Sequence, residues 1–250
     1  MEQQLQTIEH GLAVQQDTRL QQEFIEVCQQ ANELQLADNV ASVFVAADIV
    51  GKLRGLLSRE MVEHYFMPLM GTRVGFLTDR DKEGKDGKKL PPYGWETVRD
   101  CIIDGACMGL APVKNQFNII SGSMYPTKEG FSVLLKKIGV KYYISTSGDR
   151  SKPTDQTADI ECKVLYETKG GDKKNFTYVA YPKKNAFSSL DQLKGKAERK
   201  AKKALYELIT GIDLGDADEE SSTPDDQTAY VSSRKEQLRA GTAPGAPKLL

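Results

Sequence analysis

The segment from Ser189 to Gly211 carries a complete helix pattern, and it constrains the fold more than any other part of the chain. Ser189, followed three residues later by Gln192, resembles a capping box at a helix start. Gly211 follows the last apolar residue, as expected at a helix end. A helix with one apolar face must pack on another layer of structure. Between the two ends, apolar residues recur at helical spacing: Leu190, Leu193, Ala197, Ala201, Ala204, Leu205 and Leu208.

Strand-like runs upstream supply the layer on which this helix can pack. Three runs with strand character cover residues 140–146, 158–166 and 176–181, with a Gly-rich turn between the second and the third. A β-hairpin is predicted before them, with its turn at residues 121–123, followed by a short helix over 131–138. We therefore predict an α+β fold with N-terminal helices, a β-hairpin, a short helix, a three-stranded antiparallel sheet and a basic C-terminal helix.

The same patterns divide the chain into three regions. Residues 1–75 form a helical N-terminal region, in which Ser58 is a candidate helix cap. Residues 76–212 form the α+β core. Residues 213–250 have no apolar periodicity and many acidic, Ser, Pro and Gly residues, so we expect a disordered acidic tail.

Charge is sorted along the chain, although the formal net charge is only −1. Residues 183–203 contain eight Lys or Arg and two acids, whereas residues 213–226 contain seven acids and no base. The net charge of −1 argues against a wholly basic nucleic-acid coat, and the asymmetry adds a finer expectation. It predicts a basic binding surface next to an acidic tail.

The basic residues gather on one side of the expected helix. At roughly 100° per residue, Lys196, Arg199 and Lys203 project within about 60° of one another, opposite the apolar stripe. Like charges at this spacing repel, and a solvated helix face normally mixes signs. A polyanion therefore fits best, with the solvated face of an ordinary surface helix as the first alternative and an anionic membrane as the second. Nucleic acid is favoured over a membrane because the Ala-rich stripe is too small to insert. The expected DNA contacts are Lys183, Lys184, Lys194, Lys196, Arg199, Lys200, Lys202 and Lys203.

Aromatic residues near this helix are candidates for stacking on unpaired bases. Several tyrosines lie on the predicted strands, among them Tyr178 and Tyr181, and Phe187 precedes the basic helix. Strands favour aromatic residues in any case, so base contact is expected for only a minority of them.

The stretch from Trp95 to Pro112, with the hairpin and the Tyr125–Gly130 segment that leads into a short apolar helix, resembles the phage RecT and Red-beta single-strand annealing proteins. The resemblance covers roughly residues 90–212. It implies a core closed by a basic helix whose Lys and Arg line a groove for the DNA backbone, a role that falls on Lys194, Lys196 and Lys203. Where the family often has Pro-Trp this chain has Asn185-Ala186-Phe187, so Phe187 would replace the Trp.

The resemblance also implies an activity and partners. It implies annealing of complementary strands without ATP hydrolysis, with no cofactor, in rings or helical filaments of the protein. Expected partners are single-stranded DNA, further copies of the chain, a phage exonuclease and a host single-strand binding protein. The chain has no secretory leader pattern and no run of 18 apolar residues, so a cytoplasmic protein without a membrane span is expected.

Two other functions stay open. The segment from Asp159 to Lys163 contains a Glu-x-Lys motif, Glu161 and Lys163, with the carboxylates of Asp149 and Asp155 upstream, as in metal-dependent nucleases. Simple strand alternation also explains it, because Asp159, Glu161 and Lys163 share one strand face. A plain binder of single-stranded DNA or RNA is the second alternative.

Signals for other chemistry are absent from the sequence. There is no phosphate-binding loop of the G-x-x-x-x-G-K-[ST] type. We expect no metal site and no catalytic residues, because the four cysteines are scattered and there are only two histidines. A packing role is expected for His64, and the cysteines are expected to be free thiols.

Overall fold

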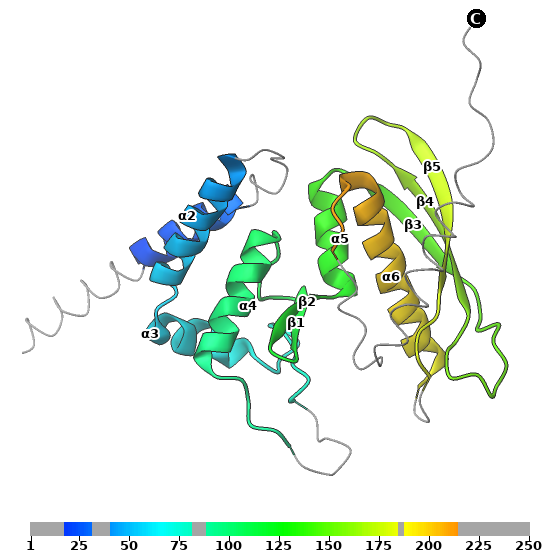
Figure 1. Cartoon of the computed structure of the whole chain (residues 1–250), viewed down its shortest axis with the longest axis horizontal. Helices are drawn as coiled ribbons and strands as arrows, with labels where there is room; N and C mark the ends of the chain where they lie inside the picture. The colour runs from blue at the N-terminus through cyan, green and yellow to red at the C-terminus, as the bar shows by residue number, and fades with distance from the viewer. Residues whose placement is uncertain (1–17, 32–40, 82–88, 185–187, 215–250) are drawn as a thin grey trace, which may run out of the picture. The chain divides into compact units, whose positions relative to one another are not determined.

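Helix α6 lies on one face of a three-stranded antiparallel sheet, and α5 packs along α6 (Figure 1). The predicted α+β class is therefore confirmed. The computed structural model describes residues 18–31, 41–81, 89–184 and 188–214. The strand order is β3-β4-β5, with both pairings antiparallel. The elements of this part are α5 (Lys128–Lys137), β3 (Lys141–Thr146), β4 (Ile160–Glu167), β5 (Lys173–Ala180) and α6 (Leu190–Thr210).

The sheet has one buried and one open face, as the alternation in its sequence predicts. On β4, Ile160, Cys162 and Val164 are buried beneath α6. The alternate residues of β4 point to the opposite side of the sheet. On that side Leu165 is exposed next to Tyr143 of β3. β5 begins three residues earlier than predicted, because the polar residues 173–175 pair with residues 165–167 of β4. Pairing with a neighbouring strand here overrides weak local β propensity.

The hairpin before α5 turns at Ser121 and Gly122. It joins β1 (Phe117–Ile120) to β2 (Ser123–Pro126). Both turn residues have positive φ, 52° and 80°, as a two-residue type I′ turn requires. The predicted hairpin is confirmed, although Ser123 belongs to the strand rather than to the turn.

Helix α5 starts at Lys128, three residues before its predicted start, because Thr127 caps it. The Thr127 hydroxyl accepts a hydrogen bond from the Gly130 amide (3.1 Å) and donates to the Asn115 carbonyl. A Cβ on Gly130 would lie 2.0 Å from the carbonyl oxygen of Gln116, so only glycine fits. The cap and this close approach hold α5 against the turn that leads into the hairpin.

The N-terminal part is helical, as predicted, and packs on α4. Ser58 caps the helix that follows it, since its Oγ accepts a hydrogen bond from the Met61 amide (3.3 Å). The chain then forms a π-helical turn that the sequence did not predict. The elements are a helix over 18–31, α2 (Ala41–Leu56), α3 (Arg59–Met61), η1 (Val62–Phe66), η2 (Met67–Leu69) and α4 (Trp95–Cys107).

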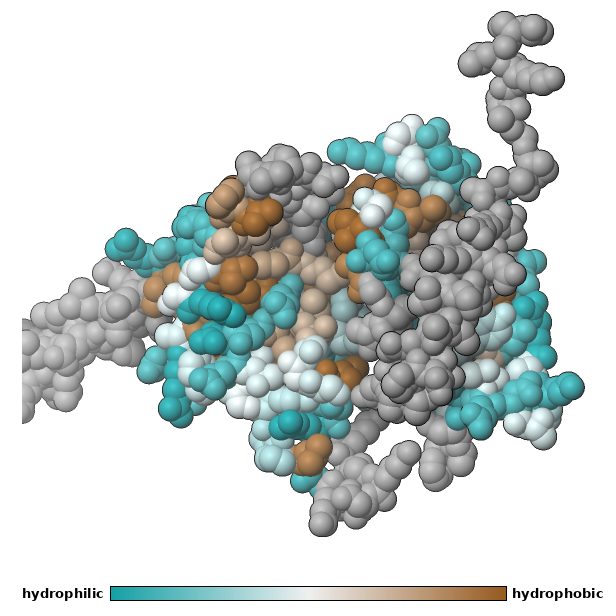
Figure 2. Space-filling model, viewed as in Figure 1, coloured by the Kyte–Doolittle hydropathy of each residue, from teal (hydrophilic) through white to brown (hydrophobic). Residues whose placement is uncertain are grey.

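Helix α2 carries apolar side chains on its surface near its start, where Val43, Phe44 and Val45 are exposed (Figure 2). All the described residues up to Ile212 belong to one compact unit. In the described part of the chain, no helix combines the length and the apolar character needed to cross a membrane.

All four cysteines are free thiols, and burial raises the pKa of Cys101 to about 12.

Candidate nucleic-acid interface

Both ends of α6 are fixed by the caps that its sequence predicts. Ser189 Oγ accepts a hydrogen bond from the Gln192 amide, and the Gln192 side chain accepts one from the Ser189 amide, both at 3.2 Å. At the other end Gly211 is left-handed, with φ of 73°, and its amide donates to the Glu207 carbonyl (2.9 Å). The caps therefore fix where α6 begins and ends. Which of its side chains reach solvent depends on how the helix packs.

The predicted apolar stripe packs on the sheet over most of its length. Leu193, Ala197, Ala201 and Leu205 are buried, and the small alanines let α6 lie close to β4. Leu190 and Leu208, at the two ends of the stripe, are exposed.

Four basic residues of α6 are exposed or half-buried, and we refer to them together as the basic face: Lys194, Lys196, Arg199 and Lys200. At roughly 100° per residue, Lys196, Arg199 and Lys200 project within about 100° of one another, whereas Lys194 projects nearer the apolar edge of the helix. No described residue forms a hydrogen bond or an ion pair with the Lys194 or Lys196 side chain. The Arg199 guanidinium lies 4.6 Å from the ring centre of Tyr125 on β2, a cation–π contact between the helix and the hairpin. The basic face therefore borders the hairpin and holds cations that can meet an anion.

The expectation that Lys202 and Lys203 belong to an open basic row is wrong. They are only 5% and 8% exposed. The Lys202 ammonium donates to Ser132 Oγ of α5 (2.9 Å), pairs with Glu198 (2.8 Å) and lies 5.4 Å from the ring centre of Tyr142. Lys203 pairs with Glu207 (3.7 Å).

The reason is that α6 has a second packed face. Besides the sheet, α6 contacts α5 along much of its length, with Tyr206 against Phe131 at 6.5 Å between ring centres. Lys202 lies on this second face. Reasoning from one apolar stripe placed the whole polar arc in solvent, and nothing in the α6 sequence marks α5 as its partner.

Replacing Glu198 by Gln is expected to destabilise the fold near pH 7 by about 2 kcal/mol, because it leaves the buried Lys202 ammonium without its carboxylate. The expected loss of stability is smaller than for a fully buried ion pair, because the Glu198 side chain is 31% exposed and solvent screens its charge. The check is urea unfolding of both proteins at pH 7.

The same variant predicts a pH dependence. Burial raises the pKa of Glu198, but hydrogen bonds and positive charge from Lys202 and Lys128 outweigh it and leave that pKa below its usual value. The carboxylate's contribution is thus present above the unfolded-state pKa of about 4.3 and is lost as the pH falls through the lower folded-state pKa. The stability difference between wild type and Glu198→Gln should shrink in that acidic range. A difference that is constant with pH would show that Glu198 acts through packing alone.

The two basic residues before the helix have different surroundings. Lys183 is exposed and continues the pairing beyond β5 through a bridge with Thr157. The Lys184 ammonium pairs with Asp149 (2.8 Å) and donates to Ser151 Oγ, which lowers the pKa of the Asp149 carboxyl. Lys184 therefore ties down the loop after β3, whereas Lys183 extends toward solvent.

Of the three aromatic candidates, only Tyr181 is seen as an exposed ring. Tyr178 is half-buried on the sheet face that carries Cys162, beneath α6. Phe187 lies outside the described residues. Tyr125 has its ring in contact with the basic face, and sequence reasoning did not single it out because its contact with Arg199 exists only in the folded chain.

The carboxylates of the nuclease-like motif are held by an arginine. Arg150 donates to Asp159 (2.8 Å) and to Glu161 (2.7 Å), and both carboxylates lie on the open sheet face, as strand alternation predicts. Across the described ranges, no three His, Cys, Asp or Glu side chains are placed to share a metal ion. In this structure the two carboxylates therefore belong to a surface ion-pair cluster with Arg150.

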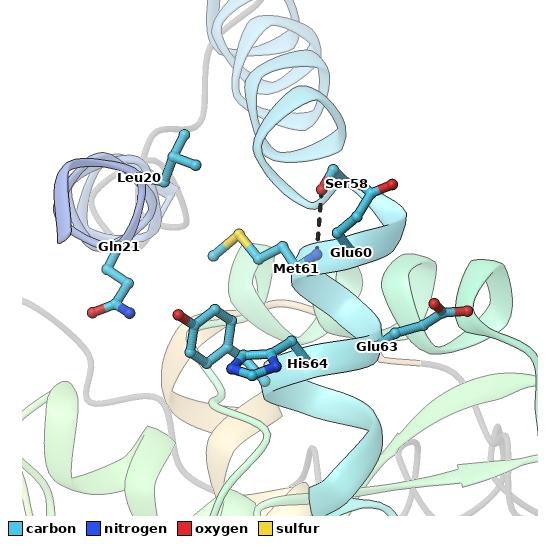
Figure 3. A pocket seen from close by; sticks show the side chains of 8 residues that line it. Leu20, Gln21, Ser58, Glu60, Met61, Glu63 and His64 are labelled. Atoms are coloured by element: carbon cyan, nitrogen blue, oxygen red, sulfur yellow. Dashed lines mark hydrogen bonds between the residues drawn. The ribbon is translucent and has the colours of Figure 1, made fainter. Parts of the chain in front are cut away.

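A pocket of about 610 Å³ lies between the helix over 18–31 and the segment that forms α3 and η1. In Figure 3, Met61 and His64 point toward Leu20 and Gln21, whereas Glu63 points away. His64 is exposed, with its ring edge-on to Tyr65 at 4.7 Å, so it does not pack in the core. Two glutamates and no Lys or Arg line the pocket, which is unsuited to a phosphate backbone.

Comparison of the chain with protein-family models, curated proteins and solved structures found no match.

Proposed function

We propose that this protein binds single-stranded DNA through the basic face of α6 and promotes ATP-independent annealing of complementary strands. The observation that carries the binding proposal is the pair Lys194 and Lys196, which have no partner among the described residues, on a helix that is capped at both ends. Ammonium groups in this position neutralise phosphates without reading sequence.

Gly195, between these lysines, gives the proposal further support. A glycine inside a helix costs about 1 kcal/mol relative to alanine. No heavy atom lies within 4 Å of where its Cβ would be, so internal packing does not require it. A bare backbone between two cations lets a phosphate approach the helix closely.

Gly195→Ala should therefore affect folding and binding in opposite directions. The fold should gain about 1 kcal/mol from helix propensity, while DNA affinity should fall because the methyl group keeps the strand away. Gly55→Ala on α2 is the matched control, since its Cβ would also meet open space. It should stabilise the fold and leave affinity unchanged. Thermal unfolding and anisotropy of a labelled oligonucleotide measure both quantities; equal affinities for all three proteins would remove Gly195 from the site.

The annealing part rests on the resemblance to the RecT and Red-beta proteins. The order α4, hairpin and α5, with the basic helix α6 at the end of the core, is the order that this resemblance leads us to expect. Under the proposal the protein assembles into rings or helical filaments in the cytoplasm and works with an exonuclease and a single-strand binding protein.

The test is annealing of two complementary oligonucleotides without ATP or metal. Each strand carries one dye of an energy-transfer pair, so that annealing brings the two dyes together. Annealing faster than in protein-free solution is expected. Binding of each strand without faster annealing would identify a plain single-strand binder. Cleavage of the oligonucleotides in a parallel reaction that contains Mg²⁺ would point to a nuclease.

A further inference from the structure

The outer face of the sheet, turned away from α6, is a second surface with unusual chemistry. No described helix lies on it (Figure 1). Its central part consists of two cross-strand rows. Tyr143, Leu165 and Asn175 form one row, and Ser145, Lys163 and Thr177 form the next.

In two ion pairs on this face, the lysine side chain extends further into solvent than its glutamate partner. Lys141 pairs with Glu167 at 3.3 Å, but the lysine side chain is 82% exposed and the glutamate 31%. Lys163 lies 3.8 Å from Glu161, with exposures of 70% and 24%. The carboxylates lie low against the sheet while the ammonium groups extend into solvent. An approaching molecule therefore meets cations first, so the face is complementary to a polyanion.

Two exposed aromatic rings accompany these cations. Tyr143 is 66% exposed and lies opposite Leu165. Tyr181, also exposed, follows β5 and by strand alternation points to the same side as Asn175 and Thr177. Tyr143 lies in the same cross-strand row as Asn175, and Asn175 is six residues before Tyr181. The rows of the two tyrosines are therefore about 20 Å apart along the strand direction. Lys163 lies between these levels, opposite Thr177.

We infer that this outer face binds single-stranded DNA, with bases stacked on Tyr143 and Tyr181 and phosphates near Lys141 and Lys163. Alternating rings and cations suit a single strand, whose base faces are free to stack, rather than a duplex, whose base faces are hidden. Leu165 is the only large aliphatic side chain exposed among the described residues of β3, β4 and β5, too little for an apolar protein contact. Because α6 packs on the opposite sheet face, this site is separate from the basic face. An annealing protein with both could hold two strands at once.

The test compares Tyr143→Val with Tyr143→Phe in the full chain. Phe keeps the stacking ring, whereas Val removes it and keeps strand propensity. Affinity for labelled oligothymidylate should be unchanged for Phe and should fall about fivefold or more for Val. Photocrosslinking with 5-iodouracil oligonucleotides, read by mass spectrometry, should mark peptides that contain Tyr143 and Tyr181. Unfolding transitions check that both variants fold.

The outcomes separate this inference from the proposal for α6. Equal binding and annealing by both variants, with crosslinks only at α6 and β2, would overturn the outer-face site and leave the α6 proposal standing. A Val variant that changes only self-association, seen by sedimentation velocity, would make the face a protein contact and also overturn it. If Tyr143→Val loses affinity while substitution of Lys194 and Lys196 does not, the outer face stands and the α6 assignment fails.

Discussion

Replacing both Lys194 and Lys196 by Gln is expected to weaken single-stranded DNA binding about tenfold at about 0.15 M salt. Each phosphate contact on a single strand contributes about 0.7 to the slope of log affinity against log salt, so two lost contacts make the slope shallower by about 1.4. Gln is nearly as good a helix former as Lys, and neither lysine is paired with a described residue, so stability should barely change. The measurement is anisotropy of a labelled oligonucleotide over a series of salt concentrations.

The matched control is the double variant Lys52→Gln and Arg54→Gln on α2. It removes the same charge from two exposed positions with the same spacing on another helix. Its affinity and salt slope should stay near wild type. Equal losses in the two double variants would mean that net charge, not the basic face, drives binding. Lys203 is unsuitable for this test because it is buried, so its removal would also perturb the packing of α6.

Gly130→Ala is expected to give the largest loss of stability, about 3 kcal/mol. The new methyl carbon would lie 2.0 Å from the Gln116 carbonyl oxygen, and a backbone atom cannot move aside as a flexible side chain can. Either α5 or the turn before the hairpin must shift, which also strains the Thr127 cap. The unfolding temperature should fall by about 9 °C, given about 3 °C per kcal/mol for a chain of this size.

Gly55→Ala again supplies the control, because the same substitution on α2 meets no heavy atom within 4 Å. It should raise stability by about 0.5–1 kcal/mol through helix propensity. A Gly130→Ala protein as stable as the wild type would show that α5 and the turn can separate at little cost.

The sequence by itself determined the elements whose signals are local. The Ser189 and Gln192 capping box, the glycine stops after α5 and α6, and the hairpin turn at Gly122 each depend on a few adjacent residues. The alternation along β4 likewise placed Ile160, Cys162 and Val164 in the core before any tertiary contact was known. The starts of α5 and β5 were misplaced because a cap at Thr127 and pairing with β4 extend them beyond their apolar residues.

Tertiary structure alone decided which basic residues are exposed and which are buried or paired. Eight cations along residues 183–203 were candidates for DNA contact. Packing of α6 buried Lys202, which contacts Ser132 of α5, and Lys203, and the loop after β3 engaged Lys184 through Asp149. The basic face was left at the first half of the helix, next to Tyr125. Helical periodicity predicts the directions in which side chains project, but which of those directions reaches solvent depends on every element that packs against the helix.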